Sequence, residues 1–369
     1  MRLACAAQIG SLATDLRHGL GDRVMTTYFR CLLLVLLSCP VLTLPARAEG
    51  TLRIISQDAN QIFPKALLDK FASAHGVEVV VVPWAPKNTW EYLSGENRPD
   101  PAPMDVLAVP DARLERIIKL GLLLPTDPAK MASFANVEPY WRTTFQDPER
   151  RFSVPLPWDA LGIEVTGATH DGPVDSSALI FDPPPDFEGP LQIGQSVVVH
   201  MALQYLGHDP CEPGDKGLQE VAALLSAVKP RTVNGNFDFD LENDGWGLQW
   251  RSEFLDVRRR ADGNWHVEDY EFGLPKEGFP VEGYHAVVLR TAPNPENARL
   301  FQEFLMMPEN AALVSAHMLG PSPIVGASDF MPEDVRKLVA VDPALAEISY
   351  RGRSCQYETY GDVLFKLTD

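Results

Sequence analysis

The feature that most constrains the fold is a strand–helix–strand pattern between residues 52 and 82. Residues 52–55 form a short apolar run that suits a strand. Leu67, Leu68 and Phe71 then recur at the spacing of one helix face. Residues 77–82 form a continuous β-branched run, which is typical of a strand buried on both faces. This order predicts a β–α–β unit, in which the helix connects two parallel strands.

Similar alternation continues along the rest of the chain. Further strands are expected at 105–110, 152–155, 160–165 and 280–289, and further helices at 114–120, 197–206, 218–228, 296–307 and 309–318. Alternation of this kind predicts an α/β protein with open, mainly parallel sheets. The length of 369 residues suits two domains, since a domain takes about 100–200 residues.

The charge balance excludes some partners. The chain has 32 Lys and Arg against 50 Asp and Glu, which gives a formal net charge of −18. Nucleic acids and anionic membranes are bound through clustered Lys and Arg. We therefore expect no nucleic-acid partner.

Residues 25–48 have the features of a secretory signal. Arg30 precedes a short apolar stretch, and Ala46 and Ala48 are the small residues of a cleavage site. The apolar stretch is shorter than the about 20 residues that span a bilayer. We expect residues 1–48 to be a leader with a signal peptide from Met25 to Ala48, and the mature protein to act in the periplasm.

Two of the five cysteines follow this leader, namely Cys211 and Cys355. An oxidising compartment makes a disulfide between them plausible, and two separate buried thiols are the alternative. The sequence alone leaves both open.

Seven segments occur in a characteristic order behind the leader. They are residues 63–71, 105–110, 152–158 with 161–163, 182–189, 201–207, 294–309 and 320–323. In this order they resemble the periplasmic substrate-binding proteins of ABC transporters, specifically the spermidine/putrescine-binding branch of extracellular solute-binding protein family 1. The resemblance extends from residue 50 to about residue 325.

The resemblance implies a two-lobed periplasmic binding protein fold of type II. Each lobe would have a central, mostly parallel sheet flanked by helices, and hinge strands would join the lobes. Lobe 1 would comprise residues 49–158 and 283–325, and lobe 2 residues 159–282 and 326–369. The chain would cross between lobes near 158–162, 283–287 and 320–325. A ligand would lie in the cleft, at the carboxyl ends of strands, and the lobes would close on it by a hinge motion.

The resemblance further implies a monomeric receptor that has no catalytic activity and no cofactor. It would bind a small polar solute, either a polyamine-like amine or another small charged metabolite, and deliver it to an ABC permease. Two alternatives remain: a secreted hydrolase that uses acids near Asp58, Asp111 and Asp159, and a receptor that presents its closed form to a membrane sensor. The chain has no G-x-S-x-G, P-loop or H-E-x-x-H motif.

Candidate ligand contacts lie where strands end at the implied cleft and where the chain crosses it. They are Gln57, Asp58 and Asn60, then Asp111 and Arg113, then Trp158 and Asp159, then Gln195 and Ser196, and finally Trp250, Arg251, Tyr284 and His285. Several also suit a structural role: Asp111 a helix cap, Trp158 a place in lobe packing, Arg113 a helix surface, and His285 a histidine with internal partners.

The site departs from the polyamine-binding pattern. Polyamine binders place carboxylates at the start of the second-lobe helix, where they neutralise ammonium groups, and the matching positions here hold Gly194 and Val197. Arg113, Arg251 and His285 suit a carboxylate or a phosphorus oxyanion instead, because Arg binds these groups through two hydrogen bonds. Trp250 and the three acids named above still suit an amine. The charge of the ligand therefore stays open.

One segment slightly resembles a calcium loop, at residues 238–249. It lacks Gly at the sixth position and Glu at the twelfth, where Gln249 stands. We expect no metal site.

Overall fold

The computed structural model describes residues 50–55, 62–82, 102–166, 170, 172–183, 191–192, 198–228, 246–260 and 270–342. The chain divides into two compact units, residues 1–47 and 48–369, and all the described residues belong to the second unit. The predicted signal peptide therefore lies outside the described residues.

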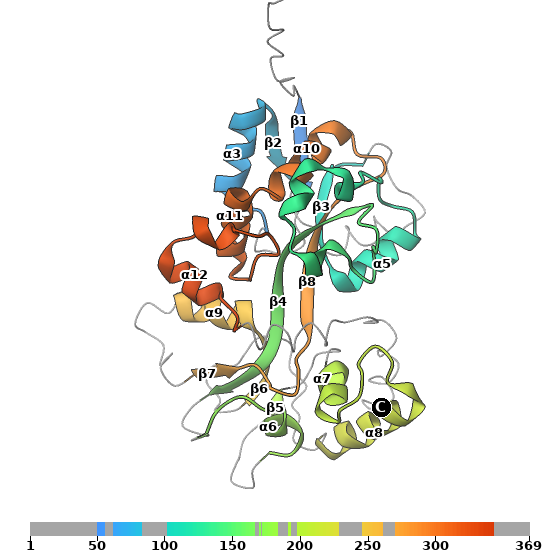
Figure 1. Ribbon diagram of the computed structural model, residues 1–369, viewed down its shortest axis with the longest axis vertical. Helices are drawn as coiled ribbons and strands as arrows, with labels where there is room; N and C mark the ends of the chain where they lie inside the picture. Colours follow the sequence, from blue (N-terminus) through green and yellow to red (C-terminus); the bar gives the residue numbers. More distant parts are fainter. Residues whose placement is uncertain are drawn as a thin grey trace, which may run out of the picture. The chain divides into compact units, whose positions relative to one another are not determined.

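Strands and helices alternate along the second unit (Figure 1). The strands are β1 Thr51–Ile55, β2 Glu78–Val81, β3 Val106–Pro110, β4 Ser153–Thr166, β5 Leu191–Gln192, β6 Trp246–Trp250, β7 Tyr270–Gly273 and β8 Val281–Val288. The α-helices are α3 Lys65–His75, α5 Asp111–Lys119, α6 Ala178–Phe181, α7 Val198–Tyr205, α8 Gly214–Val228, α9 Arg251–Arg260, α10 Pro295–Leu305, α11 Pro308–Met318 and α12 Glu333–Val339. Short 3₁₀ helices are η2 Pro128–Lys130, η3 Ala132–Asn136, η4 Pro139–Arg142 and η7 Ala327–Phe330.

The predicted β–α–β unit is confirmed. β1 pairs with β2 in parallel, and α3 connects them and buries Leu67, Leu68 and Phe71. The prediction that the second strand is buried on both faces is wrong. Val80 and Val81 are each 37% exposed, because β2 lies at the edge of the sheet and pairs with β1 alone among the described strands.

The sheet is mixed, and one strand runs through both of its halves. Its order is β2-β1-β3-β8-β4-β6-β5, and β7 also pairs with β4. β8 runs antiparallel to both β3 and β4, so antiparallel pairs stand beside the parallel ones. β4 pairs with β8 through residues 153–160 and with β6 and β7 through residues 161–166. Figure 1 shows β4 and β8 side by side.

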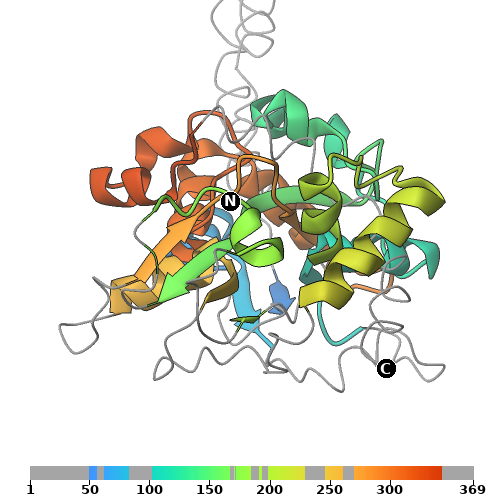
Figure 2. The ribbon, with the colours of Figure 1, turned by 90° about the horizontal axis from the view of Figure 1, so that it is seen from below.

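Two hydrophobic cores adjoin this shared strand. The larger core packs β1, β3, β8 and the first half of β4 against α3, α10 and α11 on one face of the sheet. A separate cluster packs α5 against β1, β3 and β8 on the other face. The smaller core packs the second half of β4 and β6 against α6, α7 and α8. Helices α7 and α8 lie together in both ribbon views (Figures 1 and 2). Ala160 belongs to the larger core and Leu161 to the smaller one, so the fold has two lobes that meet within β4.

The segment after α11 packs against both lobes. Ala327, Met331 and Val339 belong to the larger core. Leu319 and Leu338 pack with residues of α9 and β7, which are attached to the second half of β4. Residues 319–339 therefore form a further connection between the lobes, in addition to β4 and β8.

Helix α9 covers the second half of β4 on the face opposite the smaller core. Phe254 of α9 stacks on Phe272 of β7 at a centroid distance of 5.1 Å. Glu164 of β4 is buried here, and no described residue donates a hydrogen bond to its carboxyl group. Burial, with a smaller contribution from Glu253 on α9, raises the pKa of Glu164 from 4.5 to about 8.

This buried carboxyl group predicts a pH-dependent stability. The folded protein holds the proton of Glu164 more tightly than the unfolded chain does, so stability falls as pH rises from about 4.5 to about 8. The full shift corresponds to a free energy of about 5 kcal/mol. Glu164→Gln should reduce the pH dependence of the free energy of unfolding between pH 5 and pH 8. The variant should be more stable than the parent protein at pH 8.

Urea unfolding at a series of pH values measures this effect. Glu115→Gln is the control, because Glu115 pairs with Lys119 at the surface and should leave the slope unchanged. Parallel curves for the Glu164→Gln variant and the parent protein would contradict the prediction.

Candidate functional site

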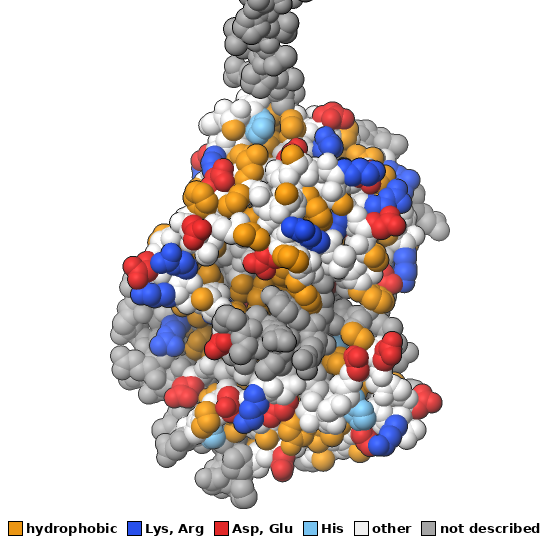
Figure 3. Space-filling view, in the orientation of Figure 1, with side chains coloured by type: hydrophobic (Ala, Val, Ile, Leu, Met, Phe, Trp, Pro, Cys, Tyr) orange, Lys and Arg blue, Asp and Glu red, His pale blue; other side chains and the backbone are white. Residues whose placement is uncertain are grey.

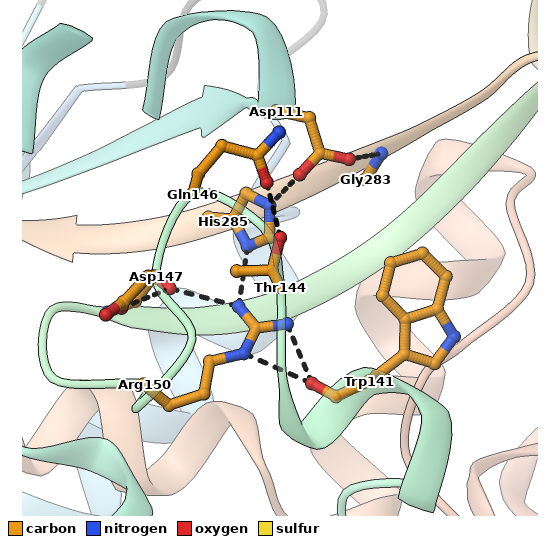
Figure 4. A network of polar contacts seen from close by, with 9 residues as sticks. Asp111, Trp141, Thr144, Gln146, Asp147, Arg150, Gly283 and His285 are labelled. Carbon is orange, nitrogen blue, oxygen red and sulfur yellow. Dashed lines mark hydrogen bonds and ion pairs between the residues drawn. The ribbon is translucent and has the colours of Figure 1, made fainter. Parts of the chain in front are cut away.

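The carboxyl end of β3 leads directly into a buried polar network, shown in Figure 4. Asp111, the first residue of α5, is 1% exposed. One carboxylate oxygen accepts a hydrogen bond from the backbone N–H of Gly283, and the other lies 2.7 Å from Nε2 of His285. The carboxylate of Asp111 thus connects the end of β3 to β8.

The protonation of His285 follows from its second neighbour. Nη1 of Arg150 lies 3.1 Å from Nδ1 of His285. A guanidinium group can only donate hydrogen bonds, so Nδ1 must accept. The ring is then neutral, and its proton is on Nε2, where it is donated to Asp111. His285 therefore links a carboxylate to a guanidinium group within the interior.

Arg150 fixes the segment that leads into β4. Its side chain is fully buried, and its guanidinium group donates to the carbonyl oxygen of Trp141 through two nitrogens and to Oγ of Ser153. The carboxylate of Asp147 accepts from the backbone N–H and the hydroxyl group of Ser153. Among the described residues, Arg150 is one of three non-glycine residues with a positive φ, at 47°. Such a backbone angle is unfavourable, and these side-chain contacts hold it in place.

Close packing surrounds this network. A Cβ atom on Gly283 would lie 2.8 Å from a carboxylate oxygen of Asp111 and 3.0 Å from the ring of Trp141, so β8 needs glycine at this position. Trp158 is buried in the larger core and stacks on Trp141 at a centroid distance of 6.1 Å. The described contacts of Trp158 are therefore packing contacts.

A second polar group lies where β4 passes from one lobe to the other. Both carboxylate oxygens of Asp159 bond to Ser252 in the first turn of α9, one to its backbone N–H and the other to its hydroxyl group. The guanidinium group of Arg251 donates to the carbonyl oxygens of Leu338, Val339 and Ala340. Burial raises the pKa of Asp159, although the hydrogen bonds from Ser252 oppose this shift, and burial lowers the pKa of Arg251.

The other candidate residues are placed differently. Trp250 is half-buried beside the smaller core, Tyr284 is half-buried beside the larger one, and Arg113 is exposed on α5. Gln57, Asp58, Asn60, Gln195 and Ser196 lie outside the described residues, as do Gly194 and Val197. The structure therefore joins Asp111 with His285 and places Asp159 beside Arg251, and the ligand contacts of all these residues stay predictions.

Cys211 takes part in a disulfide bond. Cys355 and the partner of Cys211 lie outside the described residues, so the pairing of these two cysteines stays a prediction.

Arg150, Trp141 and Ser252 were not among the candidates from sequence. Arg150 stands in a polar stretch without periodicity, and its neighbour Arg151 is a surface residue, so the sequence does not mark it as buried.

Neither a metal site nor a membrane span is found in the described part of the chain. No three His, Cys, Asp or Glu side chains come together there as metal ligands. None of the helices there combines the length and the apolar character needed to cross a bilayer. On the face shown in Figure 3, acidic and basic side chains of the described residues are interspersed.

Comparison with curated proteins finds relatives over most of the chain. No protein-family model matches it. The chain is 24% identical to the putrescine-binding periplasmic protein SpuD of Pseudomonas aeruginosa, over 87% of this chain and 91% of that protein. It is 23% identical to the spermidine/putrescine-binding periplasmic protein of Escherichia coli, over 79% of this chain and 83% of that protein.

Comparison with solved structures shows the same fold. The spermidine/putrescine ABC transporter substrate-binding protein PotD of Streptococcus pneumoniae matches with a TM-score of 0.72 and 17% identity, over 86% of this chain and 98% of that chain. The binding protein AgtB of Agrobacterium, solved with agropinic acid, matches with a TM-score of 0.62 and 18% identity, over 86% and 98%. These matches confirm the expected two-lobed, type II arrangement.

The Asp111 network predicts a measurable cost for an isosteric change. In Asp111→Asn, the new amide nitrogen faces either the N–H of Gly283 or the Nε2–H of His285, so one donor opposes another in both orientations. Moving the ring proton to Nδ1 would oppose the donor of Arg150 instead. We expect a loss of about 1–3 kcal/mol in the free energy of unfolding, because a buried polar group stays unpaired.

Chemical denaturation of Asp111→Asn and of the parent protein measures this loss in the free energy of unfolding. Asp127→Asn is the matched control: Asp127 pairs with Lys130 at 3.0 Å near the surface, and Asn tolerates its positive φ of 50°. The control should lose less than about 1 kcal/mol. An equal loss in both variants would contradict the role of the network.

Proposed function

Because the chain is related to the periplasmic substrate-binding proteins of ABC transporters, and within them to the spermidine/putrescine-binding branch, we propose that it is the extracytoplasmic receptor of an ABC importer. It binds a small polar solute between its two lobes, as a monomer and without catalysis, and delivers the solute to a membrane permease. The observation that carries the proposal is the two-lobed fold built around β4, which matches such receptors over nearly their whole length.

The leader and the relatives support the location. The curated relatives are periplasmic by name, and residues 25–48 read as a secretory signal. We propose that residues 1–48 are removed and that the mature protein acts in the periplasm. The disulfide of Cys211 agrees with an oxidising compartment.

The described carboxylates favour one of the two ligand classes left open by the sequence. A diamine needs a carboxylate or an aromatic face for each ammonium group, since a buried charge without a partner is costly. The carboxylates of Asp111 and Asp159 are engaged by donors of the chain itself. Gly194 and Val197 stand where polyamine binders have acids. We therefore propose a solute with fewer ammonium groups than a polyamine.

The same contacts weigh against the hydrolase alternative. Catalytic carboxyl groups must reach the substrate, whereas Asp111 and Asp159 are 1% and 7% exposed and hydrogen-bonded internally. The sensing alternative uses the same cleft and differs only in the membrane partner, so the proposal for ligand binding covers it.

A matched pair of solutes tests the ligand class. Putrescine and γ-aminobutyrate each have four carbons, and a terminal CH2–NH3⁺ group of the former corresponds to the carboxylate of the latter. We expect γ-aminobutyrate to bind the mature protein more tightly than putrescine in isothermal titration calorimetry. Tighter binding of putrescine or spermidine would contradict the proposed ligand class and leave the receptor function standing.

Native mass spectrometry of the purified protein tests the receptor function itself. We expect one small molecule per chain to be carried through purification and to be lost on partial unfolding. If no solute is retained, and none from a panel of amines, amino acids and organic acids binds, the receptor proposal fails. Chemical conversion of a retained solute would favour the hydrolase instead.

A further inference from the structure

Two of the predicted ligand contacts, Asp159 and Arg251, each hold the end of a helix. The first backbone N–H groups of a helix have no acceptor within the helix, and a carboxylate is favourable beside them. Asp159 supplies this carboxylate to α9, because Ser252 donates to it at 3.1 Å through the backbone. It also accepts from Ala160 at 2.8 Å within β4. The N-terminus of α9 is thus fixed to the crossing strand.

Arg251 acts on the opposite kind of helix end. The last carbonyl groups of a helix lack donors within the helix, and a cation is favourable there. Its guanidinium group donates to the carbonyl oxygens of Leu338 at 2.5 Å, Ala340 at 3.0 Å and Val339 at 3.4 Å. Leu338 and Val339 are the last two residues of α12, and Ala340 follows the helix. Figure 1 shows α12 beside α9.

α9 belongs to the lobe of the smaller core, whereas α12 packs against both lobes, with Leu338 beside α9 and Val339 in the larger core. α9 follows β6 directly, and Trp250 at the end of β6 pairs with Leu161, the first residue of β4 in the smaller core. α12 reaches the larger core through Val339 and the preceding Met331. The contact between Arg251 and α12 therefore spans the two lobes at the point where β4 crosses.

We propose that Arg251 and Asp159 are positioning residues that set the balance between arrangements of the two lobes. Asp159 holds α9 on the crossing strand, and Arg251 forms a latch, defined here as its hydrogen bonds to residues 338–340. A rotation of one lobe against the other must strain or break this latch. The inference rests on the proposed receptor function, in which the ligand works by shifting this balance.

The latch suits this role because it is strong and local. Hydrogen bonds from a charged donor are about twice as strong as neutral ones. Nη2 of Arg251 donates to both Leu338 and Ala340, so a displacement of α12 would lose contacts of the guanidinium group. Losing the latch should change the equilibrium constant between the lobe arrangements about tenfold. A change of this size is expected for the loss of hydrogen bonds to a charged group.

The distance between the lobes tests the proposal, in protein whose retained solute has been removed by partial unfolding and refolding. Spin labels are carried on keto-bearing non-natural amino acids at positions 65 on α3 and 216 on α8, so the cysteines stay intact. Lys65 and Lys216 are exposed, at 83% and 82% of the side chain. Double electron–electron resonance then gives the distance distribution. In Arg251→Met, we expect the fraction of molecules at distances other than the main distance of the parent protein to rise about tenfold.

Arg259→Met is the matched control. Arg259 lies on the same helix and pairs with Asp256 at the surface, so its removal should leave the distribution unchanged. Arg251→Lys keeps the charge but not the planar fork, and should give an intermediate shift. Should Arg251→Met not fold, Arg251→Lys and Asp159→Asn carry the test, with far-UV circular dichroism as the check on folding.

An unchanged distribution in a folded Arg251 variant would overturn the proposal, and so would an equal shift in Arg259→Met. Because no ligand is present, a role of Arg251 in direct ligand contact would leave this measurement unaffected. Failure of the solute panel would instead count against the receptor function, so the two failures are distinguishable.

Discussion

The structure depends on one strand that has to satisfy two sets of partners. β4 gives its backbone hydrogen bonds to β8 up to Ala160 and to β6 and β7 from Leu161 onward. Because buried backbone donors and acceptors must be paired, the change of partner has to occur within one peptide step, without a loop. The side chains change core at the same step. The two lobes are therefore joined by one continuous strand, whose pairing with β8 is interrupted by a register shift between Pro155 and Trp158.

Charged side chains complete this junction from inside. A buried charge is tolerated only when it is paired and hydrogen-bonded, and the networks of Asp111 and of Asp159 meet this condition with donors from distant segments. Arg150 joins the segment before β4 to β8 through His285, and Arg251 joins α9 to α12. Both networks hold separate parts of the chain together, and this role is independent of the ligand.

The sequence predicted the order of elements well, because hydrophobic periodicity reports local burial. The unit of β1, α3 and β2 followed from Leu67, Leu68 and Phe71 and from the valine run, whereas the edge position of β2 depends on the absence of a further strand beside it among those described. Residue types also indicated internal polar roles for Asp111 and His285, whereas Asp159 and Arg251 were predicted only as ligand contacts. Which partners they have could not be predicted, because Gly283, Ser252 and residues 338–340 lie about 90 to 170 positions away. Arg150 was missed because it stands in a polar stretch without periodicity, which does not mark it as buried.

The stacked pair of Trp141 and Trp158 has a spectroscopic consequence. Their indole rings are 6.1 Å apart and inclined by 27°, close enough for their electronic transitions to couple. Trp158 belongs to the crossing strand and Trp141 to a neighbouring 3₁₀ helix, and both rings are buried in the larger core. The protein therefore contains its own optical reporter of how β4 packs within that core, which can be followed in the ultraviolet circular dichroism without any added dye.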